Sequence, residues 1–328
     1  MKVAVLGAGA WGTALALQLS SRGHAITLWG HDAGHLRDLA AEGTNRRYLP
    51  GIPLPPTWRI EPSLPAAVDA GPDAVVVAVP SKAFRLVARS LSATRGMVVS
   101  VTKGIEHDTG LTMCGILQEV AGSARVAALS GPSLALEVAR GIPTAVVAAS
   151  PESEVAQGVQ SLFNGPSFRV YTSEDRLGVE LGGALKNVVA IAAGVCDGLG
   201  FGDNSKAALV TRGIVEMRRL GVAAGARAET FAGLSGLGDL TVTCFSRQSR
   251  NRGFGERIGR GDTVSGIEAT TSSVAEGYPT ARSARQLARR HRVATPIIDE
   301  VYSLLYEGKS AAEALRALMT REAKGEQG

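Results

Sequence analysis

Three glycines near the start of the chain constrain its fold more than any other feature. Gly7, Gly9 and Gly12 form the pattern G-x-G-x-x-G, which directly follows an apolar run at residues 3–6 and opens a helical pattern at residues 10–21. Glycine allows the backbone to turn tightly and to approach a pyrophosphate, whose charge is then held by amides at the helix N-terminus. Glycine-rich turns also occur for structural reasons alone, so the pattern by itself is a weak signal. Its position at the start of a β-α-β pattern favours dinucleotide binding.

Short apolar runs, several of them rich in valine, alternate with helical patterns through the first half of the chain. They lie at residues 3–6, 25–29, 74–79, 97–101, 126–129, 144–148 and 168–171. Continuous runs of this kind are typical of strands buried on both faces, which indicates a parallel sheet covered by helices. We therefore expect an α/β fold, with an N-terminal Rossmann-like doubly wound sheet at residues 1–174 and an all-helical C-terminal domain at residues 175–328. Proline-rich residues 49–56 are expected to form a surface loop.

The second part of the chain carries helical patterns with defined ends. An apolar stripe at helical spacing runs through Leu177, Leu181, Leu185, Val188 and Ala192. Further helices are expected around residues 207–220 and from Pro296 to a stop at Gly308. Ser310 and Glu313 have the spacing of a capping box, which predicts the start of the last helix.

Composition excludes several classes of protein. The chain has 45% hydrophobic and 20% charged residues, which is typical of a globular protein, and its formal charge of +5 is too small to indicate nucleic-acid binding. No apolar run reaches the roughly 18 to 20 residues of a transmembrane segment, and no secretory pattern is present. The three cysteines are widely spaced without a C-x-x-C pair, so we expect neither disulfides nor a metal site. A cytoplasmic location is the simplest interpretation.

The end of the second predicted strand bears on the choice of cofactor. An acidic residue there would hold the ribose 2′-hydroxyl of NAD, but the sequence has Gly30 and His31, with Asp32 slightly too late. Because the missing acid removes repulsion of a 2′-phosphate, and His31, Arg46 or Arg47 could supply positive charge, we expect NADP to be accepted, alongside NAD. The alternative is that these three residues are only solvated loop residues.

Three later strands are followed by residues that suit a ligand site at the carboxyl edge of the sheet. Residues 79–82 could line the cofactor, and Lys103 places an ammonium at the cleft. Residues 130–133 open a helical pattern whose amides could hold an anion, with Gly131 and Ser133 at its start. Ser133 could equally be a plain helix N-cap.

Lys186 is a candidate for acid–base chemistry. The chain has only seven lysines among 35 basic residues, and Lys186 stands in a core-like helix. Lysine can lose its proton when it is desolvated, whereas arginine cannot. Gly182, Gly183, Ala190 and Ala193 surround it at helical spacing, which predicts a clearing of small residues with room for a substrate. The alternative is a lysine that reaches from a packed helix to solvent.

A glycine-rich segment leads to Asp239 and then to a cluster of arginines. Glycines before Asp239 suit a backbone that passes close to another group, and a carboxylate near Lys186 would orient the ammonium. Arginines in residues 247–260 could bind phosphate oxygens. Without other information, that segment is better explained as a solvated basic loop.

Five motifs in order resemble the bacterial NAD(P)-dependent glycerol-3-phosphate dehydrogenase family. They are GAGAWGTALA at residues 7–16, TKGIE at 102–106, LSGPSLALEVARG at 129–141, ELGGALKNVVAIAAG at 180–194 and GLGDLTVTCFSRQSRNRGFG at 236–255. The resemblance implies reversible hydride transfer between NAD(P)H and dihydroxyacetone phosphate, which yields sn-glycerol 3-phosphate for phospholipid synthesis. It also implies a homodimer. Ala10 stands where some members carry serine.

The resemblance assigns roles to individual residues. Lys186 corresponds to the catalytic proton donor and acceptor, and Lys103 to a lysine that touches both cofactor and substrate. The implied substrate contacts are Lys103, Gly131, Ser133, Lys186, Asp239, Ser249, Arg250 and Asn251. The implied cofactor contacts, together with the glycines and Arg47 named above, are Ala10, Trp11, His31, Lys103, Ala135, Arg250, Val274 and Glu276. For Arg250 the resemblance implies a phosphate ligand and thus replaces the interpretation of its segment as a solvated basic loop.

Two alternatives stay open on the sequence alone. One is a different two-domain dehydrogenase that acts on a hydroxy acid or an acyl thioester, which would not need residues 249–251 to hold a terminal phosphate. The other is a protein that binds NAD(P)H as a signal without turnover.

Overall fold

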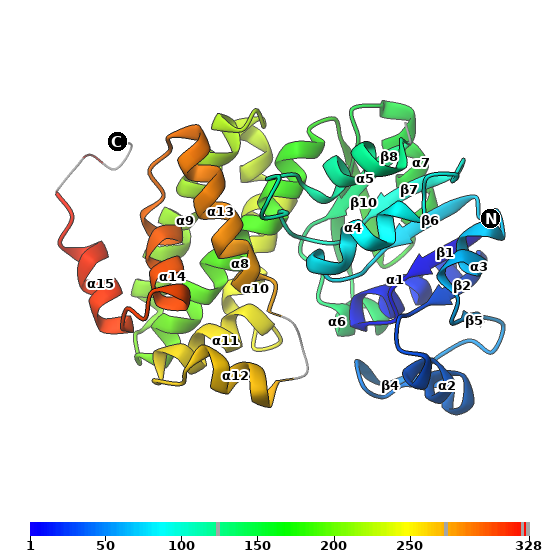
Figure 1. Ribbon diagram of the computed structural model, residues 1–328, viewed down its shortest axis with the longest axis horizontal. Coiled ribbons are helices and arrows are strands. Elements are labelled where there is room, and N and C mark those ends of the chain that lie inside the picture. Colours follow the sequence, from blue (N-terminus) through cyan, green and yellow to red (C-terminus); the bar gives the residue numbers. More distant parts are fainter. Residues whose placement is uncertain (123–124, 272–274, 323–324, 326–328) are drawn as a thin grey trace.

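The computed structural model describes residues 1–122, 125–271, 275–322 and 325. Figure 1 shows a sheet with helices on both of its faces in one half and a group of helices in the other half. The last strand of the sheet ends at Ser173, and the long helix that opens the second half begins at Arg176. The predicted change from α/β to all-helical structure is therefore confirmed.

Eight strands form the main sheet, in the order β10-β9-β8-β7-β6-β1-β2-β5. Their bounds are β1 (Lys2–Leu6), β2 (Ala25–Trp29), β5 (Arg59–Glu61), β6 (Ala74–Val77), β7 (Met97–Ser100), β8 (Val126–Ser130), β9 (Thr144–Ala149) and β10 (Phe168–Ser173). All seven predicted strands are present, with ends that differ by at most two residues. Strand β5, at the edge, carries no valine-rich run and was not predicted.

The sheet is not parallel throughout, which corrects the prediction. Strands β8 and β9 pair antiparallel, while β9 and β10 pair parallel to each other. The segment between β8 and β9 contains only a short helix, α6 (Ala135–Ala139), and it returns along the edge where β8 ends instead of crossing a face of the sheet. Apolar runs cannot reveal this reversal, because a buried strand has the same composition in either direction.

Alternation along the strands divides the core of this half into two layers. Val3 and Val5 of β1 face one layer, and Ala4 and Leu6 face the other. The first layer is packed by α1 (Ala10–Ser21), α2 (Ala33–Glu42) and α7 (Ser153–Phe163), and the second by α3 (Leu64–Asp69), α4 (Ser81–Arg89) and α5 (Met113–Ala121). Helices on both faces explain why these strands are apolar throughout.

The proline-rich segment does not form a plain loop, which is a second correction. Residues Leu49–Pro53 form β4, which pairs antiparallel with the short strand β3 (Thr44–Asn45). This two-stranded sheet tolerates its prolines because both strands are edges. The hairpin lies beside α2, the helix that follows β2, as Figure 1 shows.

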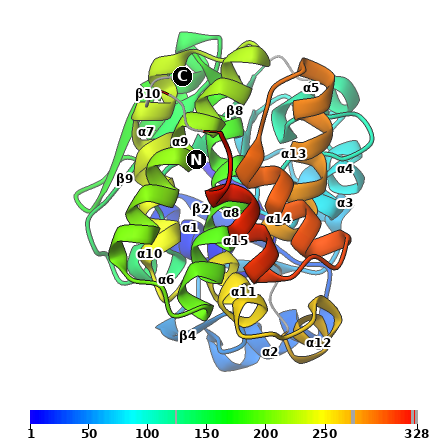
Figure 2. The same cartoon turned by 90° about the vertical axis from the view of Figure 1, so that its left-hand side faces the viewer.

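The second half consists of helices packed around a central one. They are α8 (Arg176–Gly198), α9 (Asp203–Ala223), a 3₁₀ turn (Ala228–Ala232), a π-helical turn (Leu234–Gly238), α10 (Asp239–Phe245), α11 (Arg250–Gly259), α12 (Val264–Thr270), α13 (Gly277–His291), α14 (Pro296–Tyr306) and α15 (Ala311–Met319). In Figure 2, α8 lies in the middle, and α9, α10, α11, α13 and α14 all contact it. The predicted capping box of Ser310 and Glu313 is present at α15.

Helix α8 is longer and more apolar than the predicted stripe from Leu177 to Ala192. By length and composition alone it could cross a membrane, since its most apolar 18-residue stretch has a mean hydropathy of 1.5. However, 89% of that stretch is buried inside the protein. A core helix passes the same test as a membrane span. Its burial makes α8 the axis on which the second half is built, and Lys186 lies on it.

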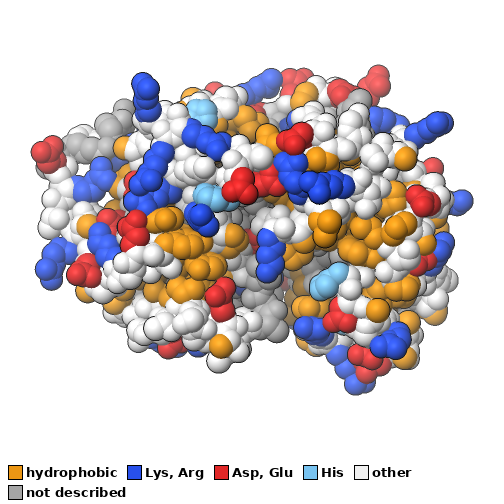
Figure 3. All heavy atoms as spheres, in the orientation of Figure 1, with side chains coloured by type: hydrophobic (Ala, Val, Ile, Leu, Met, Phe, Trp, Pro, Cys, Tyr) orange, Lys and Arg blue, Asp and Glu red, His pale blue; other side chains and the backbone are white. Residues whose placement is uncertain are grey.

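Charged side chains are mixed on the surface. On the face drawn in Figure 3, Lys and Arg side chains are interspersed with Asp and Glu over both halves of the molecule. This face therefore lacks the basic stripe that is typical of nucleic-acid binders.

Candidate functional site

The glycine turn after β1 has two glycines that the fold itself requires. Gly7 has a φ of +131°, and a Cβ at this position would overlap the carbonyl of Ala78. A Cβ at Gly12 would overlap the carbonyl of Gly7, because α1 starts directly against the turn. These two glycines therefore allow β1, β6 and α1 to approach each other closely.

Gly9 has no such neighbour, and this distinguishes it from the other two. A Cβ at Gly9 would have no protein atom within 4 Å. Gly9 is the N-cap of α1, no side chain caps this helix end, and its first turn holds no acidic residue. The amides that open α1 are thus left for an anion, and the open side of Gly9 gives a pyrophosphate room to lie against the backbone. The residues present fit a dinucleotide.

A compact charged cluster links the two halves of the molecule. The Lys186 ammonium, from α8, binds the Asp239 carboxylate at the start of α10, and the Lys103 ammonium binds the other Asp239 oxygen at 2.5 Å. Lys103 also donates to the carbonyl oxygen of Gly131 at 3.1 Å. Lys186 is only 6% exposed and Asp239 1%, so Lys186 does not reach out to solvent. The structure therefore brings together four of the predicted site residues.

Thr243 belongs to this cluster and was not predicted. Its hydroxyl donates to the Asp239 carbonyl at 2.6 Å and accepts from the Lys186 ammonium, also at 2.6 Å. Because the Thr243 hydroxyl gives its single proton to the Asp239 carbonyl, its oxygen can only accept a hydrogen bond from Lys186. This arrangement fixes the orientation of the Lys186 ammonium. Thr243 follows Asp239 by four residues, so helical spacing from Asp239 could have pointed to it.

The protonation of Lys186 is shifted into the physiological range. Burial is the largest cause and lowers the pKa of Lys186 from its ordinary 10.5 to about 7, Asp239 opposes this lowering, and the positive charge of Lys103 adds to it. An amine with this pKa exists in both forms near neutral pH. It can therefore give up a proton or take one, as a general acid or base must.

The small residues around Lys186 do not form an open clearing, which corrects that prediction. A Cβ at Gly182 would lie 2.6 Å from the Ser235 carbonyl oxygen of the π-helical turn. A Cβ at Gly183 would lie 2.6 Å from the Ser130 hydroxyl and 3.3 Å from the Lys103 side chain. These glycines thus admit other parts of the protein, including the Lys103 side chain, rather than substrate. The glycine-rich approach to Asp239 does pass close to another group, as expected, and that group is α8.

The segment after β8 differs from the predicted helix start. Helix α6 begins at Ala135 and has five residues, and Ser133 does not cap it. The Ser133 hydroxyl donates instead to the Gly131 carbonyl at 2.9 Å, the same oxygen that accepts from Lys103. Gly131 has a φ of +139°, a backbone conformation that favours glycine. Ser133 therefore lies beside the cluster through Gly131.

Most of the arginine-rich segment at residues 247–260 forms helix α11, which corrects its interpretation as a solvated basic loop. Ser249 is the N-cap of α11, and its side chain accepts from the Arg252 amide. Arg250, at the first helical position, is exposed, whereas Asn251 is buried. The Asn251 amide donates to Asn187, the residue next to Lys186, at 2.9 Å and accepts from the Gly277 amide at 2.8 Å. Through Asn251 the start of α11 is tied to the helix of the lysine.

Glu276 joins the helical half to the sheet. Its carboxylate accepts from the Ser81 hydroxyl at 2.5 Å and from the Ser81 amide at 3.2 Å, at the start of α4 where β6 ends. Burial, the largest cause, raises the pKa of Glu276, while the Ser81 hydrogen bonds and the Arg250 charge lower it. Ser81 thus faces the same edge of the sheet as the glycine turn. Val274, the other predicted cofactor contact of this segment, lies outside the described residues.

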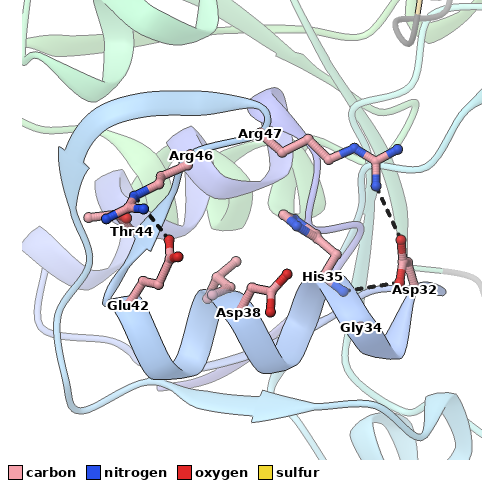
Figure 4. Close-up of a pocket in the computed structure, with 9 residues that line it drawn as sticks. Asp32, Gly34, His35, Asp38, Glu42, Thr44, Arg46 and Arg47 are labelled. Atoms are coloured by element: carbon pink, nitrogen blue, oxygen red, sulfur yellow. Dashed lines mark hydrogen bonds and ion pairs between the residues drawn. The ribbon is translucent and has the colours of Figure 1, made fainter.

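Two ion pairs that the sequence did not reveal lie at the two ends of α2, the helix that follows β2. Asp32 is the N-cap of α2 and pairs with Arg47 at 3.2 Å, and Arg46 pairs with Glu42 at 3.1 Å. The His35 amide, the largest cause, and Arg47 hold the pKa of Asp32 below its usual range. Figure 4 shows the two ion pairs on opposite sides of a cavity of about 370 Å³, with His35 between them. Both arginines therefore already have a carboxylate partner.

The remaining predicted cofactor residues lie at the carboxyl edge of the sheet. Ala10 and Trp11 open α1 and are half-buried, and His31 is exposed just after β2. Ala135 opens α6 and is half-buried. They follow β1, β2 and β8, whose carboxyl ends share one edge. Whether each of them touches a cofactor stays a prediction.

Comparison with protein families gives one consistent result. The family model described as NAD-dependent glycerol-3-phosphate dehydrogenase N-terminus matches residues 2–156, and the corresponding C-terminus model matches residues 175–316. A curated protein named glycerol-3-phosphate dehydrogenase [NAD(P)+] from Chlorobium limicola is 49% identical over 332 residues, which cover 99% of each chain. The protein of the same name from Anaeromyxobacter dehalogenans is 48% identical, covering 99% of this chain and 100% of its own.

A solved structure agrees with these relatives. The crystal structure of glycerol-3-phosphate dehydrogenase from Coxiella burnetii superposes with a TM-score of 0.94 at 38% sequence identity, and the match covers 98% of this chain and 99% of that one. The similarity therefore extends over both halves of the molecule and over their arrangement.

Proposed function

The chain belongs to the NAD-dependent glycerol-3-phosphate dehydrogenase family, and from this membership we propose that it catalyses the reversible reduction of dihydroxyacetone phosphate by NAD(P)H to sn-glycerol 3-phosphate. The observation that carries the proposal is the buried Lys186, whose amine has a pKa of about 7 and is held by Asp239 and Thr243. A ketone reduction needs such an acid beside the carbonyl oxygen, and the reverse reaction needs the same group as a base.

Each part of the site has one task in this reaction. Bound NAD(P)H supplies a hydride to the carbonyl carbon. Lys186 donates a proton from Nζ to the carbonyl oxygen as negative charge develops there, which leaves a neutral amine and an alcohol. Lys103 adds a second positive charge next to the same oxygen, and Asp239 orients both ammonium groups. The start of α11, with Ser249, Arg250 and Asn251, holds the substrate phosphate.

Cofactor binding involves the glycine turn and the ends of the neighbouring strands. The backbone from Gly9 holds the pyrophosphate, with Ala10, Trp11 and His31 beside it. Glu276 contacts Ser81 at the same edge, and Ala135 follows β8 there. Arg47 meets the 2′-phosphate of NADP.

We further propose the biological setting and the domain division. The protein works in the cytoplasm as a homodimer, and its product supplies glycerophospholipid synthesis. Its three cysteines are free, which suits a reducing compartment. The domains are residues 1–174 and 175–328, a division supported by the gap between the two family matches and by the start of α8 at Arg176.

The proposed reaction is tested by following nicotinamide absorbance with dihydroxyacetone phosphate and with unphosphorylated dihydroxyacetone. We expect kcat/KM to be larger for the phosphorylated ketone by a factor of roughly 10³ or more, because a charged anchor contributes several kcal/mol only when the phosphate is present. Comparable values for the two ketones would refute the phosphate anchor. They would instead favour a dehydrogenase for another small substrate. Binding of NADPH with no oxidation of it would favour a sensor protein.

The ion pair between Asp32 and Arg47 leads to a prediction about cofactor preference. Replacement of Arg47 by Gln should lower kcat/KM for NADPH roughly 3- to 10-fold and leave that for NADH nearly unchanged, since only NADPH carries the 2′-phosphate. Replacement of Asp32 by Asn should raise kcat/KM for NADPH, because it releases Arg47 from its carboxylate partner. The measurement is the ratio of kcat/KM values for the two cofactors.

A matched control for this prediction is Arg46→Gln. It removes the same charge from the neighbouring position, where the arginine pairs with Glu42 on the far side of the cavity in Figure 4. If Arg46→Gln shifts the cofactor ratio as much as Arg47→Gln, the role assigned to Arg47 is wrong.

A further inference from the structure

Helices α8 and α11 are in contact through their backbones. A Cβ at Gly194 of α8 would overlap the Arg252 carbonyl of α11, and a Cβ at Gly255 of α11 would overlap the Ile191 carbonyl of α8. One turn further along, Gly198 and Gly259 repeat the pattern, since a Cβ at either would also meet the backbone of the opposite helix. Glycines four residues apart on both helices allow this close approach. The contact leaves no side-chain layer that could shift between the two helices.

A buried group of charges closes the same contact. One oxygen of Asp197, near the end of α8, binds the Lys206 ammonium of α9, and the other lies 2.6 Å from Nε of Arg252 on α11. The three side chains are only 10 to 13% exposed. The Lys206 ammonium also lies 5.2 Å from the centre of the Phe245 ring at the end of α10. Helices α8, α9 and α11 thus meet at one carboxylate, and α10 contacts the Lys206 ammonium through Phe245. The proposed reaction uses none of these groups.

The position of Asp197 relates two parts of the site to each other. It follows Lys186 by eleven residues on the same helix, about three turns. Its partner Arg252 directly follows Ser249, Arg250 and Asn251 in the first turn of α11. Asp197 therefore ties the proposed phosphate-binding turn to the helix that carries the proposed proton donor.

A buried ion pair is a poor device for stability but a good one for geometry. Removing charges from water costs several kcal/mol per ion, and apolar residues of the same size often stabilise a protein as well or better. The attraction between two buried charges, however, weakens as they separate, so it favours the relative position of the helices in which Asp197 and Arg252 meet. With the glycine contact, the pair of Asp197 and Arg252 sets α11 at one place along α8.

We propose that Asp197 is a positioning residue that sets the distance between the phosphate-binding turn and Lys186, and through it the length of substrate that the enzyme accepts. The inference rests on the proposed function. A ketone held by its phosphate places its carbonyl beside Lys186 only if this distance matches the three-carbon substrate.

The test is Asp197→Asn, measured with the full-length enzyme. We expect KM for dihydroxyacetone phosphate to rise roughly 10- to 100-fold, because a displacement of about 1 Å at the anchor has effects of this size. KM for NADPH should stay the same, and so should kcat/KM for unphosphorylated dihydroxyacetone, which does not use the anchor. The matched control is Glu256→Gln, which removes the other partner of Arg252 but within α11, and which should leave KM for dihydroxyacetone phosphate unchanged.

A second variant covers the case in which Asp197→Asn does not fold, since it removes the buried negative charge that faces Lys206 and Arg252. Arg252→Gln keeps Asp197 paired with Lys206 and should raise the same KM. If the two residues act as one link, the double variant should be no worse than the poorer single one. A lower melting temperature with unchanged KM, or an equal loss with dihydroxyacetone, would show that Asp197 only supports the fold. Failure of the wild-type enzyme to discriminate the two ketones would instead overturn the proposed function.

Discussion

Replacement of Lys186 by alanine is expected to lower kcat for the reduction roughly 10²- to 10⁴-fold, the range that a single general acid contributes. The physical reason is that Lys186 has the only amine in the described cluster that is fully buried and held in line by both Asp239 and Thr243. Lys103 is anchored to Asp239 and Gly131 and cannot replace it without leaving them. Binding of NADPH, followed by its fluorescence, should survive, because the glycine turn is untouched.

Two further variants separate the proton from the rest of the side chain. Lys186→Met keeps most of the buried volume, so an equal loss of kcat would assign the effect to the amine and not to a cavity. Lys186→Arg keeps the positive charge but cannot release a proton near neutral pH, and it should also remain inactive. Turnover unchanged in all three variants would refute the role of Lys186 as general acid.

The pH dependence of the wild-type enzyme follows from the pKa of Lys186, which burial lowers to about 7. Reduction requires the ammonium form, so kcat/KM for reduction should be constant below about pH 7 and fall about tenfold per unit above it. Oxidation of glycerol 3-phosphate requires the neutral amine, so its kcat/KM should rise with pH up to about 7 and then level off. In Lys186→Met the residual activity should show neither the fall in kcat/KM for reduction above about pH 7 nor the rise in kcat/KM for oxidation below it.

Features that depend on local spacing could be predicted from the sequence. The glycine turn, the buried Lys186 and the strands of the sheet each carry their signal within a few residues, and the structure places them as expected. Asp239 was also identified, because its glycine-rich approach indicated a close contact. In each of these cases the residue type itself indicates its role. Gly7 can adopt a positive φ, and Lys186 can lose a proton when it is buried.

Features that depend on which segments meet in space could not be predicted. The glycines beside Lys186 were interpreted as room for substrate, but they admit Lys103 and Ser235, which come from distant parts of the chain. Asp32 and Arg47 lie 15 residues apart, and their ion pair needs the hairpin of β3 and β4 beside α2. The reversal between β8 and β9 leaves no trace in composition. A glycine can make room for a ligand or for another part of the protein, and only the fold distinguishes the two cases, as it does for Gly9 and Gly183.

Removal of the Arg250 guanidinium is the second change with a large expected effect. Arg250→Gln should raise KM for dihydroxyacetone phosphate roughly 30- to 1,000-fold, the cost of leaving a bound phosphate without its charged partner. The side chain suits this role because it opens α11 and is exposed. Backbone amides at the start of α11 favour the same anion.

The comparison of two substrates and two control variants makes this prediction specific. With unphosphorylated dihydroxyacetone, Arg250→Gln should have little effect on kcat/KM, since that ketone has no phosphate to lose. Arg247→Gln removes an exposed arginine just before α11 and should leave both substrates unaffected. Arg250→Lys keeps the charge but loses the two-pronged geometry, so its KM should lie between those of the wild type and Arg250→Gln. Equal losses for the two ketones would mean that Arg250 acts through the cofactor contact that the family resemblance also implies, or through the fold, and that the substrate phosphate is held elsewhere.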